Sequence, residues 1–214
     1  MSAEAARTFD PMELDGATDW LLDGGLLVIP TESWYAVAAD PRSPAAVDAV
    51  FRCKGRPTDR PLPLLAGDRQ QVQLAAPGWL DLPNAARLAD TFWPGPLALI
   101  LPASRGVAPG VLDPRQRLAI RCSAHPLASG LARLFGFPLT ATSANRTGAP
   151  PARDPHAAVA SLALSGRVAL LDGGQTAGGA PSTIVDPATD PPDVLREGAI
   201  DVDAIRRCLF GERA

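Results

Sequence analysis

Short apolar runs and amphipathic stretches alternate along most of the chain. The apolar runs have the length of β-strands and are bounded by glycine, proline or polar residues. They cover residues 26–29, 62–66, 97–101, 118–120, 139–141, 168–171 and 183–185. Most of them are continuous rather than alternating, which predicts strands that are buried on both faces.

The amphipathic stretches begin where proline follows a residue that can cap a helix. Proline has no amide hydrogen to leave unpaired at the first helical position, and the preceding side chain can accept a hydrogen bond from the free backbone N–H groups. Four dipeptides fit this pattern: Asp10-Pro11, Ser43-Pro44, Asp154-Pro155 and, more weakly, His125-Pro126. Helical spacing also covers 85–92, and Gly24 and Gly136 stand where two helices are expected to end.

Helices interleaved with buried strands predict an α/β domain built in layers. The 214 residues are enough for one sizeable core, so we expect a single domain over residues 1–214. Segments 103–116 and 173–181 have the composition of mobile loops, and the second is rich in glycine.

Charge and cysteine content argue against several classes of protein. Lys and Arg total 20 against 23 Asp and Glu, a net charge of −3 at pH 7, which does not suit a protein that coats nucleic acid or anionic membrane. Three scattered cysteines and two histidines do not suit a disulfide scaffold or a structural zinc site. Neither a secretory signal nor a membrane-length apolar run is visible, so we expect a cytoplasmic protein.

Cationic, hydroxyl and amide side chains gather where the predicted strands begin or end. Residues 30–35 follow the first apolar run, 140–145 close another, Ser182 precedes the last, and Arg196 follows a further short run. In α/β sheets ligands bind at strand ends, and cations with few carboxylates suit a phosphate or a carboxylate. A phosphate site here would be unconventional, because no Walker A, GxGxxG or GxSxG motif occurs.

Lys54 is the only lysine, and it stands in Lys54-Gly55-Arg56-Pro57 after a predicted helix. Position alone leaves two interpretations, an anion site or exposed charges at a helix C-terminus, where cations are favoured. Gly55 would let the backbone approach a ligand closely.

Seven segments between residues 25 and 200 resemble the YrdC family, the L-threonylcarbamoyladenylate synthases. Single motifs of this kind are weak, but seven in the family's order are specific. The segments are GLLVIPTESWY (25–35), KGRPTDRPL (54–62), FWPGPL (92–97), RCSAHP (121–126), PLTATSANRTG (138–148), STIVD (182–186) and LREGA (195–199).

The resemblance implies a twisted, mixed α/β sheet flanked by helices with a concave cleft, the YrdC/RibB-like fold. The chain resembles the short single-domain form, with its motif-bearing core at about 25–200. The implied enzyme is a nucleotidyltransferase whose substrates are L-threonine, bicarbonate and ATP with Mg²⁺. Threonine becomes a carbamate, which attacks the α-phosphate of ATP to give threonylcarbamoyl-AMP and pyrophosphate. A tRNA-modifying threonylcarbamoyl transferase complex would then use the adenylate at tRNA adenosine 37, so we expect at most weak tRNA binding by this chain.

The same resemblance assigns the candidate site residues. Lys54 and Arg56 would be catalytic, because nucleotidyl transfer needs positive charge where pyrophosphate develops negative charge. Threonine would be bound by Thr31, Tyr35 and Ser182. ATP would be bound by Lys54, Arg56, Arg60, Arg121, Ser143, Asn145 and Arg196, and no protein side chain is assigned to the metal. If Lys54 and Arg56 lie in an open cleft, replacing them should cost little stability.

Other interpretations stay open at this point. A non-catalytic RNA-binding module of the same fold, or a paralogue that adenylates another carbamate, could carry the same motifs. Ser143 and Asn145 could be turn residues that satisfy their own backbone. Arg121 could equally be the buried partner of an acid.

Departures from the family's pattern bear on the choice of substrate. The glycines that usually follow the tyrosine are Ala36 and Ala38 here, and the proline after the arginine is Cys122. Alanine would be strained if those positions needed a positive φ. Cys53 is expected to be buried and inert, unless neighbouring Lys54 lowers its pKa and makes it reactive.

Overall fold

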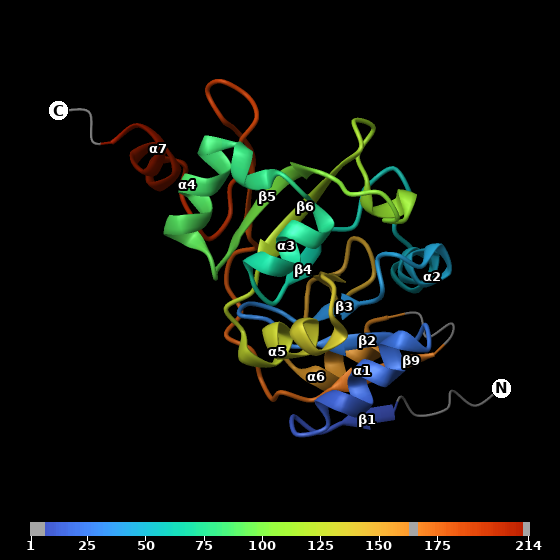
Figure 1. Ribbon diagram of the computed structural model, residues 1–214. Helices are drawn as coiled ribbons and strands as arrows, with labels where there is room; N and C mark the ends of the chain where they lie inside the picture. Colours follow the sequence, from blue (N-terminus) through green and yellow to red (C-terminus); the bar gives the residue numbers. More distant parts are fainter. Residues whose placement is uncertain (1–6, 163–166, 212–214) are drawn as a thin grey trace.

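The computed structural model describes residues 7–162 and 167–211, and its strands form two mixed sheets (Figure 1). The first sheet runs in the order β1 (Arg7–Phe9), β9 (Val168–Leu171), β2 (Leu26–Ile29), β3 (Ala36–Ala38), β8 (Thr142–Ser143). The second runs in the order β11 (Asp193–Arg196), β10 (Thr183–Asp186), β5 (Leu97–Pro102), β6 (Arg117–Cys122), β4 (Leu64–Ala66), β7 (Leu139–Thr140). Strand β2 is parallel to β9 and antiparallel to β3, and β5 is parallel to β10 and antiparallel to β6.

The α/β class and the mixed pairing flanked by helices are confirmed, and the structure adds that the strands are divided between two sheets. Strand β3 folds back on β2 with Val28 opposite Val37, and its other edge pairs with β8, which is the last strand of the first sheet. The hydrophobic pattern could not reveal this, because apolar runs show which segments are buried and not which strands pair.

Seven of the eleven strands in the described residues were predictable from apolar runs, and four were not. Strands β1, β3 and β8 have only two or three residues, and β11 is a largely exposed edge strand with only two apolar residues. The continuous runs in β2, β4 and β9 are buried throughout, as predicted.

Two of the predicted caps are present in the expected form. Ser43 accepts a hydrogen bond from the N–H of Ala46 at the start of α2 (Pro44–Lys54), at 3.3 Å. Asp154 accepts one from the N–H of Ala157 at the start of α6 (Pro155–Ala160), at 2.8 Å.

The other predicted helices differ in detail. Helix α5 (Pro126–Phe135) begins at its proline without a side-chain cap and ends at left-handed Gly136. Helix α1 (Leu14–Leu22) begins later than Pro11, because Asp10 accepts from the N–H groups of Met12 and Glu13 in a preceding turn. The remaining helices are α3 (Arg69–Ala75), α4 (Pro83–Phe92) and α7 (Val202–Phe210).

Helices cover both faces of the first sheet, and α5 also packs against β4 of the second sheet. Helices α1 and α5 pack on one face of the first sheet, and α2 and α6 pack on the other (Figure 1). Helices α3 and α4 pack against β6 and β5 of the second sheet, and α7 packs against α4. In the described part of the chain, no helix is long and apolar enough to cross a membrane.

Candidate functional site

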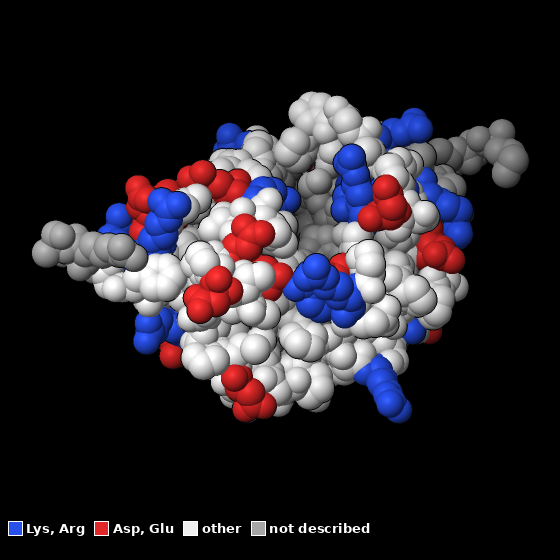
Figure 2. Space-filling view, turned by 90° about the horizontal axis from the view of Figure 1, so that it is seen from above, with Lys and Arg blue, Asp and Glu red and all other residues white. Residues whose placement is uncertain are grey.

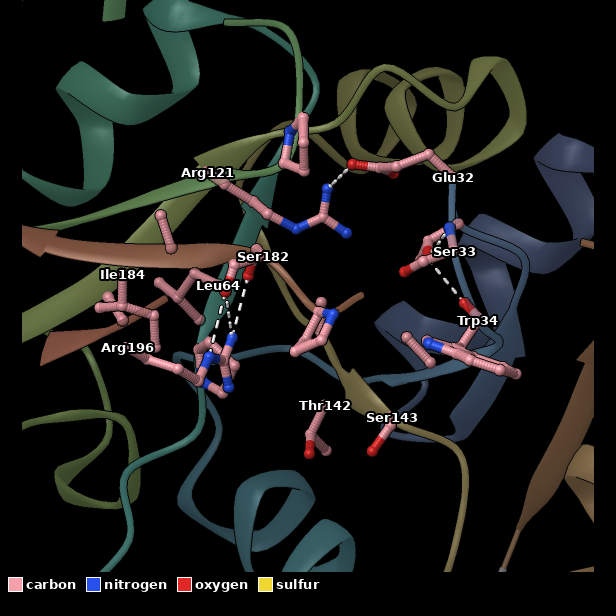
Figure 3. Close-up of a pocket in the computed structure, with 18 of the residues that line it drawn as sticks. Glu32, Ser33, Trp34, Leu64, Arg121, Thr142, Ser143, Ser182, Ile184 and Arg196 are labelled. Atoms are coloured by element: carbon pink, nitrogen blue, oxygen red, sulfur yellow. Dashed lines mark hydrogen bonds and ion pairs between the residues drawn. The ribbon is translucent and has the colours of Figure 1, made fainter. Parts of the chain in front are cut away.

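A cavity of about 270 Å³ lies between the two sheets. One wall is the loop between β2 and β3 together with β8, and the opposite wall comes from β4, β5, β6, β10 and β11 (Figure 3). The polar side chains that line it are Thr31, Glu32, Ser33, Tyr35, Arg56, Arg121, Thr142, Ser143, Ser182 and Arg196.

Strand β6 supplies Arg121 because its side chains alternate between two environments. Leu118, Ile120 and Cys122 are buried in the core beneath the helices, and the residues between them are only partly buried. Successive residues of a strand point to opposite faces. Ala119 and Arg121 therefore face the cavity.

Arg121 reaches across the cavity to Glu32 in the opposite wall (Figure 3). Its guanidinium donates to Oε1 of Glu32, and the other carboxylate oxygen accepts from the hydroxyl of Ser123 at 2.9 Å. The two side chains of the ion pair are 12% and 21% exposed. Arg121 is thus the partner of an acid, and it also lines the cavity.

Arg56 and Arg196 are held by backbone carbonyl oxygens instead of carboxylates. Arg56 donates to the carbonyls of Arg60 and Pro61, at 2.9 and 3.2 Å. Arg196 donates twice to the carbonyl of Ser182, at 3.0 and 2.7 Å, and once to its hydroxyl, at 3.1 Å. Both guanidinium groups are therefore oriented without being neutralised.

Positive charge accumulates along this wall. Burial, followed by the charges of Arg60 and Arg196, lowers the pKa of Arg56, and burial followed by Arg121 lowers the pKa of Arg196. Guanidinium groups nonetheless remain charged at neutral pH. Figure 2 shows a hollow on the upper face of the molecule with Lys and Arg side chains beside it. A bound anion would relieve the repulsion between these cations.

Lys54 is buried, which corrects the expectation that it lies in an open cleft. Its side chain is 2% exposed, and Nζ donates to the carbonyl oxygens of Ser143 and of Asn145, the latter at 2.7 Å. Burial, followed by the charge of Arg56, lowers the pKa of Lys54 to about 8. Lys54 therefore supports the 143–145 segment from behind the cavity wall.

Gly55 has a different role from the close approach expected of it. It ends α2 in the left-handed conformation, with φ 58°, and a Cβ atom there would meet nothing within 4 Å. Its value is conformational, because other residues rarely adopt this φ.

Ser143 and Asn145 differ in their surroundings. Ser143 is exposed at the end of β8 and lines the cavity. Asn145 is 8% exposed, and its amide nitrogen donates to the carbonyls of Arg146 and Ala149, at 3.0 and 2.6 Å. Ser143 is thus available to a ligand, and Asn145 holds the turn that follows.

Thr31 and Tyr35 shape the first-sheet wall. The Thr31 hydroxyl donates to the carbonyl of Trp34 at 2.6 Å. The Tyr35 hydroxyl donates to the carbonyl of Gly174 at 2.7 Å and accepts from the N–H of Gly173 at 3.1 Å, and burial raises its pKa to about 12. Tyr35 therefore ties the glycine-rich segment 173–181 to the wall.

The cavity brings together most of the predicted site residues, but not all of them. Those that line it are Thr31, Tyr35, Arg56, Arg121, Ser143, Ser182 and Arg196. Lys54, Arg60 and Asn145 do not line it. The sequence analysis assigned no role to Glu32, although it lies in segment 30–35 and its polar character at a strand end was a usable signal.

The departures from the family's pattern cause no backbone strain. Ala36 and Ala38 lie in β3, and neither has a positive φ. Ala36 lines the cavity, so its methyl group occupies space that a glycine would leave open.

Burial raises the pKa of the Cys122 thiol to about 12. Burial also raises the pKa of the Cys53 thiol, and the charge of Lys54 has a smaller, opposite effect. Cys53 is therefore not an activated thiol.

The residues present do not form a resident magnesium site. Within 7–162 and 167–211, no three His, Cys, Asp or Glu side chains are placed to hold a metal ion. Glu32, the one carboxylate among the cavity-lining residues, is already paired with Arg121. Mg²⁺ commonly binds through the phosphates of a nucleotide and retained waters, a mode that needs few protein ligands.

The curated relatives to which this chain is similar include two threonylcarbamoyl-AMP synthases. A threonylcarbamoyl-AMP synthase from Bacillus subtilis is 38% identical over 211 residues, which cover 94% of this chain and 58% of that protein. A threonylcarbamoyl-AMP synthase from Thiobacillus denitrificans is 37% identical over 174 residues, which cover 81% of this chain and 90% of that protein.

A solved structure is also similar. The crystal structure of Pyrococcus abyssi Sua5 complexed with L-threonine matches with a TM-score of 0.86 and 30% identity, over 98% of this chain and 62% of that one. This chain spans little more than half the length of the curated P. abyssi and B. subtilis relatives, 56% and 58%. The sequence profile of the Sua5/YciO/YrdC family, described as "Telomere recombination", matches residues 19–198. The chain belongs to the Sua5/YciO/YrdC family.

Proposed function

We propose that the protein is an L-threonylcarbamoyladenylate synthase, a nucleotidyltransferase that makes threonylcarbamoyl-AMP and pyrophosphate from L-threonine, bicarbonate and ATP. One observation carries the proposal: Arg56, Arg121 and Arg196 line a single cavity together with only one carboxylate. Such a site suits a triphosphate. The names of the relatives and the L-threonine complex of P. abyssi Sua5 support this choice of reaction.

The proposed chemistry needs positioning and charge stabilisation, with no covalent enzyme intermediate. An oxygen of the threonine carbamate forms a bond to the α-phosphorus of ATP, the bond to the bridging β-phosphate oxygen breaks, and pyrophosphate leaves with that electron pair. Arg56 and Arg196 would stabilise the charge that develops on pyrophosphate. Ser143 would donate its hydroxyl to the α-phosphate, and Lys54 would act by positioning Ser143.

The threonine subsite would lie along Thr31, Tyr35 and Ser182. The hydroxyls of Thr31 and Tyr35 already donate to backbone carbonyls, so these residues would offer walls and acceptor lone pairs rather than free donors. Arg121, oriented by Glu32, would bind an anionic group of either substrate. Mg²⁺ would be carried by ATP.

The proposed partner is a threonylcarbamoyl transferase complex that consumes the adenylate. The chain itself would bind tRNA weakly, because the protein carries a net charge of −3 at pH 7 and the cavity arginines offer a local patch of positive charge. Titration of labelled tRNA at rising salt tests this, and tight binding that persists at high salt would instead favour the RNA-binding module.

The function is tested by pyrophosphate release from the purified protein with ATP and Mg²⁺. We expect release to require both L-threonine and bicarbonate. Equal release with serine or glycine would keep adenylation but remove the threonine assignment, and would favour a paralogue that acts on another carbamate. No release above background with any amino acid would overturn the proposal.

A further inference from the structure

Trp34 forms part of the cavity wall, and hydrogen bonds hold it in place. Its indole N–H donates to the carbonyl of Gly179 at 3.0 Å, and its own carbonyl accepts from the Thr31 hydroxyl. The neighbouring carbonyl of Ser33 accepts from the N–H of Gly178 at 2.7 Å. Because the polar end of the indole is already satisfied, its flat face is left for apolar or stacking contacts.

The other three tryptophans pack against other side chains of the protein. Trp79 and Trp93 are buried and lie 5.5 Å apart, centroid to centroid. Trp20 packs edge-on against Phe9 at 6.3 Å and beneath the guanidinium of Arg167 at 4.4 Å. Among residues 7–162 and 167–211, Trp34 has no such aromatic or cationic partner, and it is the tryptophan that lines the cavity.

The cavity is chemically polarised, with Trp34 away from the cations. In Figure 3, Arg121 and Arg196 lie along the second-sheet wall, and Trp34 lies on the opposite side above Ser143. Ser33 and Ser143, which lie near Trp34 in Figure 3, are small and uncharged and also line the cavity. A ligand with an anionic end and a flat aromatic end matches this arrangement.

We propose that Trp34 is a stacking platform for the base of the nucleotide substrate. The inference rests on the proposed function, in which ATP supplies the phosphates that the arginines bind. Threonine and bicarbonate have no aromatic face, so the base is the one part of the three substrates that gains from an indole. Stacking of a base on an aromatic side chain contributes about 1–3 kcal/mol per base, and it tolerates different bases.

The test compares ATP with inorganic tripolyphosphate, each with Mg²⁺, as ligands of wild type, Trp34→Ala and Trp34→Phe. We expect Trp34→Ala to raise the Kd of ATP about tenfold and to leave the Kd of tripolyphosphate unchanged, since only ATP carries a base. Trp34→Phe should retain most of the ATP affinity. Indole fluorescence should be quenched by ATP in wild type and in Trp20→Phe, but not in Trp34→Phe.

Three outcomes would overturn the proposal: an ATP Kd within twofold of wild type in Trp34→Ala, an equal weakening of ATP and tripolyphosphate, or no ATP binding by wild type. Equal weakening would mean that Trp34 only holds the 173–181 segment in place. Turnover is measured separately, so wild type that binds ATP with base-dependent affinity but releases no pyrophosphate with threonine and bicarbonate would overturn the proposed function alone.

Discussion

Arg121 of β6 and Glu32 of the loop after β2 form an ion pair that joins the two sheets across the cavity. The Ser123 hydroxyl donates to the second carboxylate oxygen of Glu32 and so fixes the orientation of that carboxylate. The carboxylate in turn fixes the orientation of the Arg121 guanidinium. Glu32 thereby acts as a positioning residue for Arg121. The pair also offsets one of the three cavity-lining arginine charges, and leaves Arg56 and Arg196 free to attract an anion.

Replacing Glu32 with Gln keeps the shape of the side chain and removes its charge. We expect kcat/KM for pyrophosphate release to fall about tenfold, because hydrogen bonds to charged groups contribute about 1.5–3 kcal/mol and this pair is partly screened by solvent. Asp113→Asn is the matched control. Asp113 forms an ion pair with Arg117, which lies in β6 like Arg121; the side chains of this pair are similarly exposed, and neither residue lines the cavity. This variant should lower stability without lowering kcat/KM, and an equal loss of activity in both variants would rule out the positioning role.

Lys54→Met should affect stability as well as turnover, because the ammonium is buried and donates hydrogen bonds to two backbone carbonyl oxygens. We expect the free energy of unfolding to fall by about 1–3 kcal/mol, and turnover to fall by about 10²-fold as the 143–145 segment shifts. Denaturant unfolding and pyrophosphate release measure the two effects. Near-normal values of both would show that Lys54 supports nothing at this site.

The same lysine gives a pH dependence whose sign is fixed. Its pKa is lowered to about 8 in the folded protein, whereas an unfolded lysine titrates near 10.4. Between these values the unfolded state binds more protons, so the wild type gains stability as pH rises. The difference in unfolding free energy between wild type and Lys54→Met should therefore widen from about pH 7.5 to about pH 9.5. A constant or shrinking difference would contradict the lowered pKa.

Ser143→Ala and Asn145→Ala should separate activity from stability. Ser143 is exposed in the cavity, so its loss should lower turnover about tenfold with little change in Tm. Asn145 donates two partly buried hydrogen bonds, so its loss should lower the unfolding free energy by about 2 kcal/mol. Thermal denaturation and turnover of both variants decide this. The opposite pattern would mean that Asn145 contacts the ligand and Ser143 only shapes the turn.

Arg56→Lys should be damaging despite the retained charge. Two nitrogen atoms of the planar Arg56 guanidinium donate hydrogen bonds to two backbone carbonyl oxygens. A lysine ammonium cannot reproduce that planar geometry. We expect at least a tenfold loss in kcat/KM for ATP. Arg52→Lys, on the exposed side of the same helix end, is the control and should behave as wild type. Equal activity of Arg56→Lys and Arg52→Lys would show that the guanidinium of Arg56 has no role in ATP binding or turnover.

The predictable parts of the fold are those set by local chemistry. Ser43 and Asp154 cap helices where the sequence places them, and buried strands such as β2 follow from continuous apolar runs. The division into two sheets depends on pairing by β3 and β8, which are too short to leave a hydrophobic signature.

The site residues that could be predicted are also those set by local sequence. Arg121, Arg196 and Ser143 lie in motifs at strand ends, and all three line the cavity. The burial of Lys54 could not be predicted, since it depends on where the distant 143–145 segment places its carbonyl oxygens. The ion pair between Glu32 and Arg121 likewise depends on how the two sheets pack against each other, which the sequence around either residue does not show.

Identification of the product tests the central proposal most directly. The purified protein is incubated with ATP, Mg²⁺, L-threonine and ¹³C-labelled bicarbonate, quenched quickly, and examined by mass spectrometry. The proposed function predicts threonylcarbamoyl-AMP that carries the label, formed together with pyrophosphate and absent when threonine or bicarbonate is omitted. Pyrophosphate or AMP without a labelled adenylate, or an equal yield of labelled adenylate with serine in place of threonine, would contradict it.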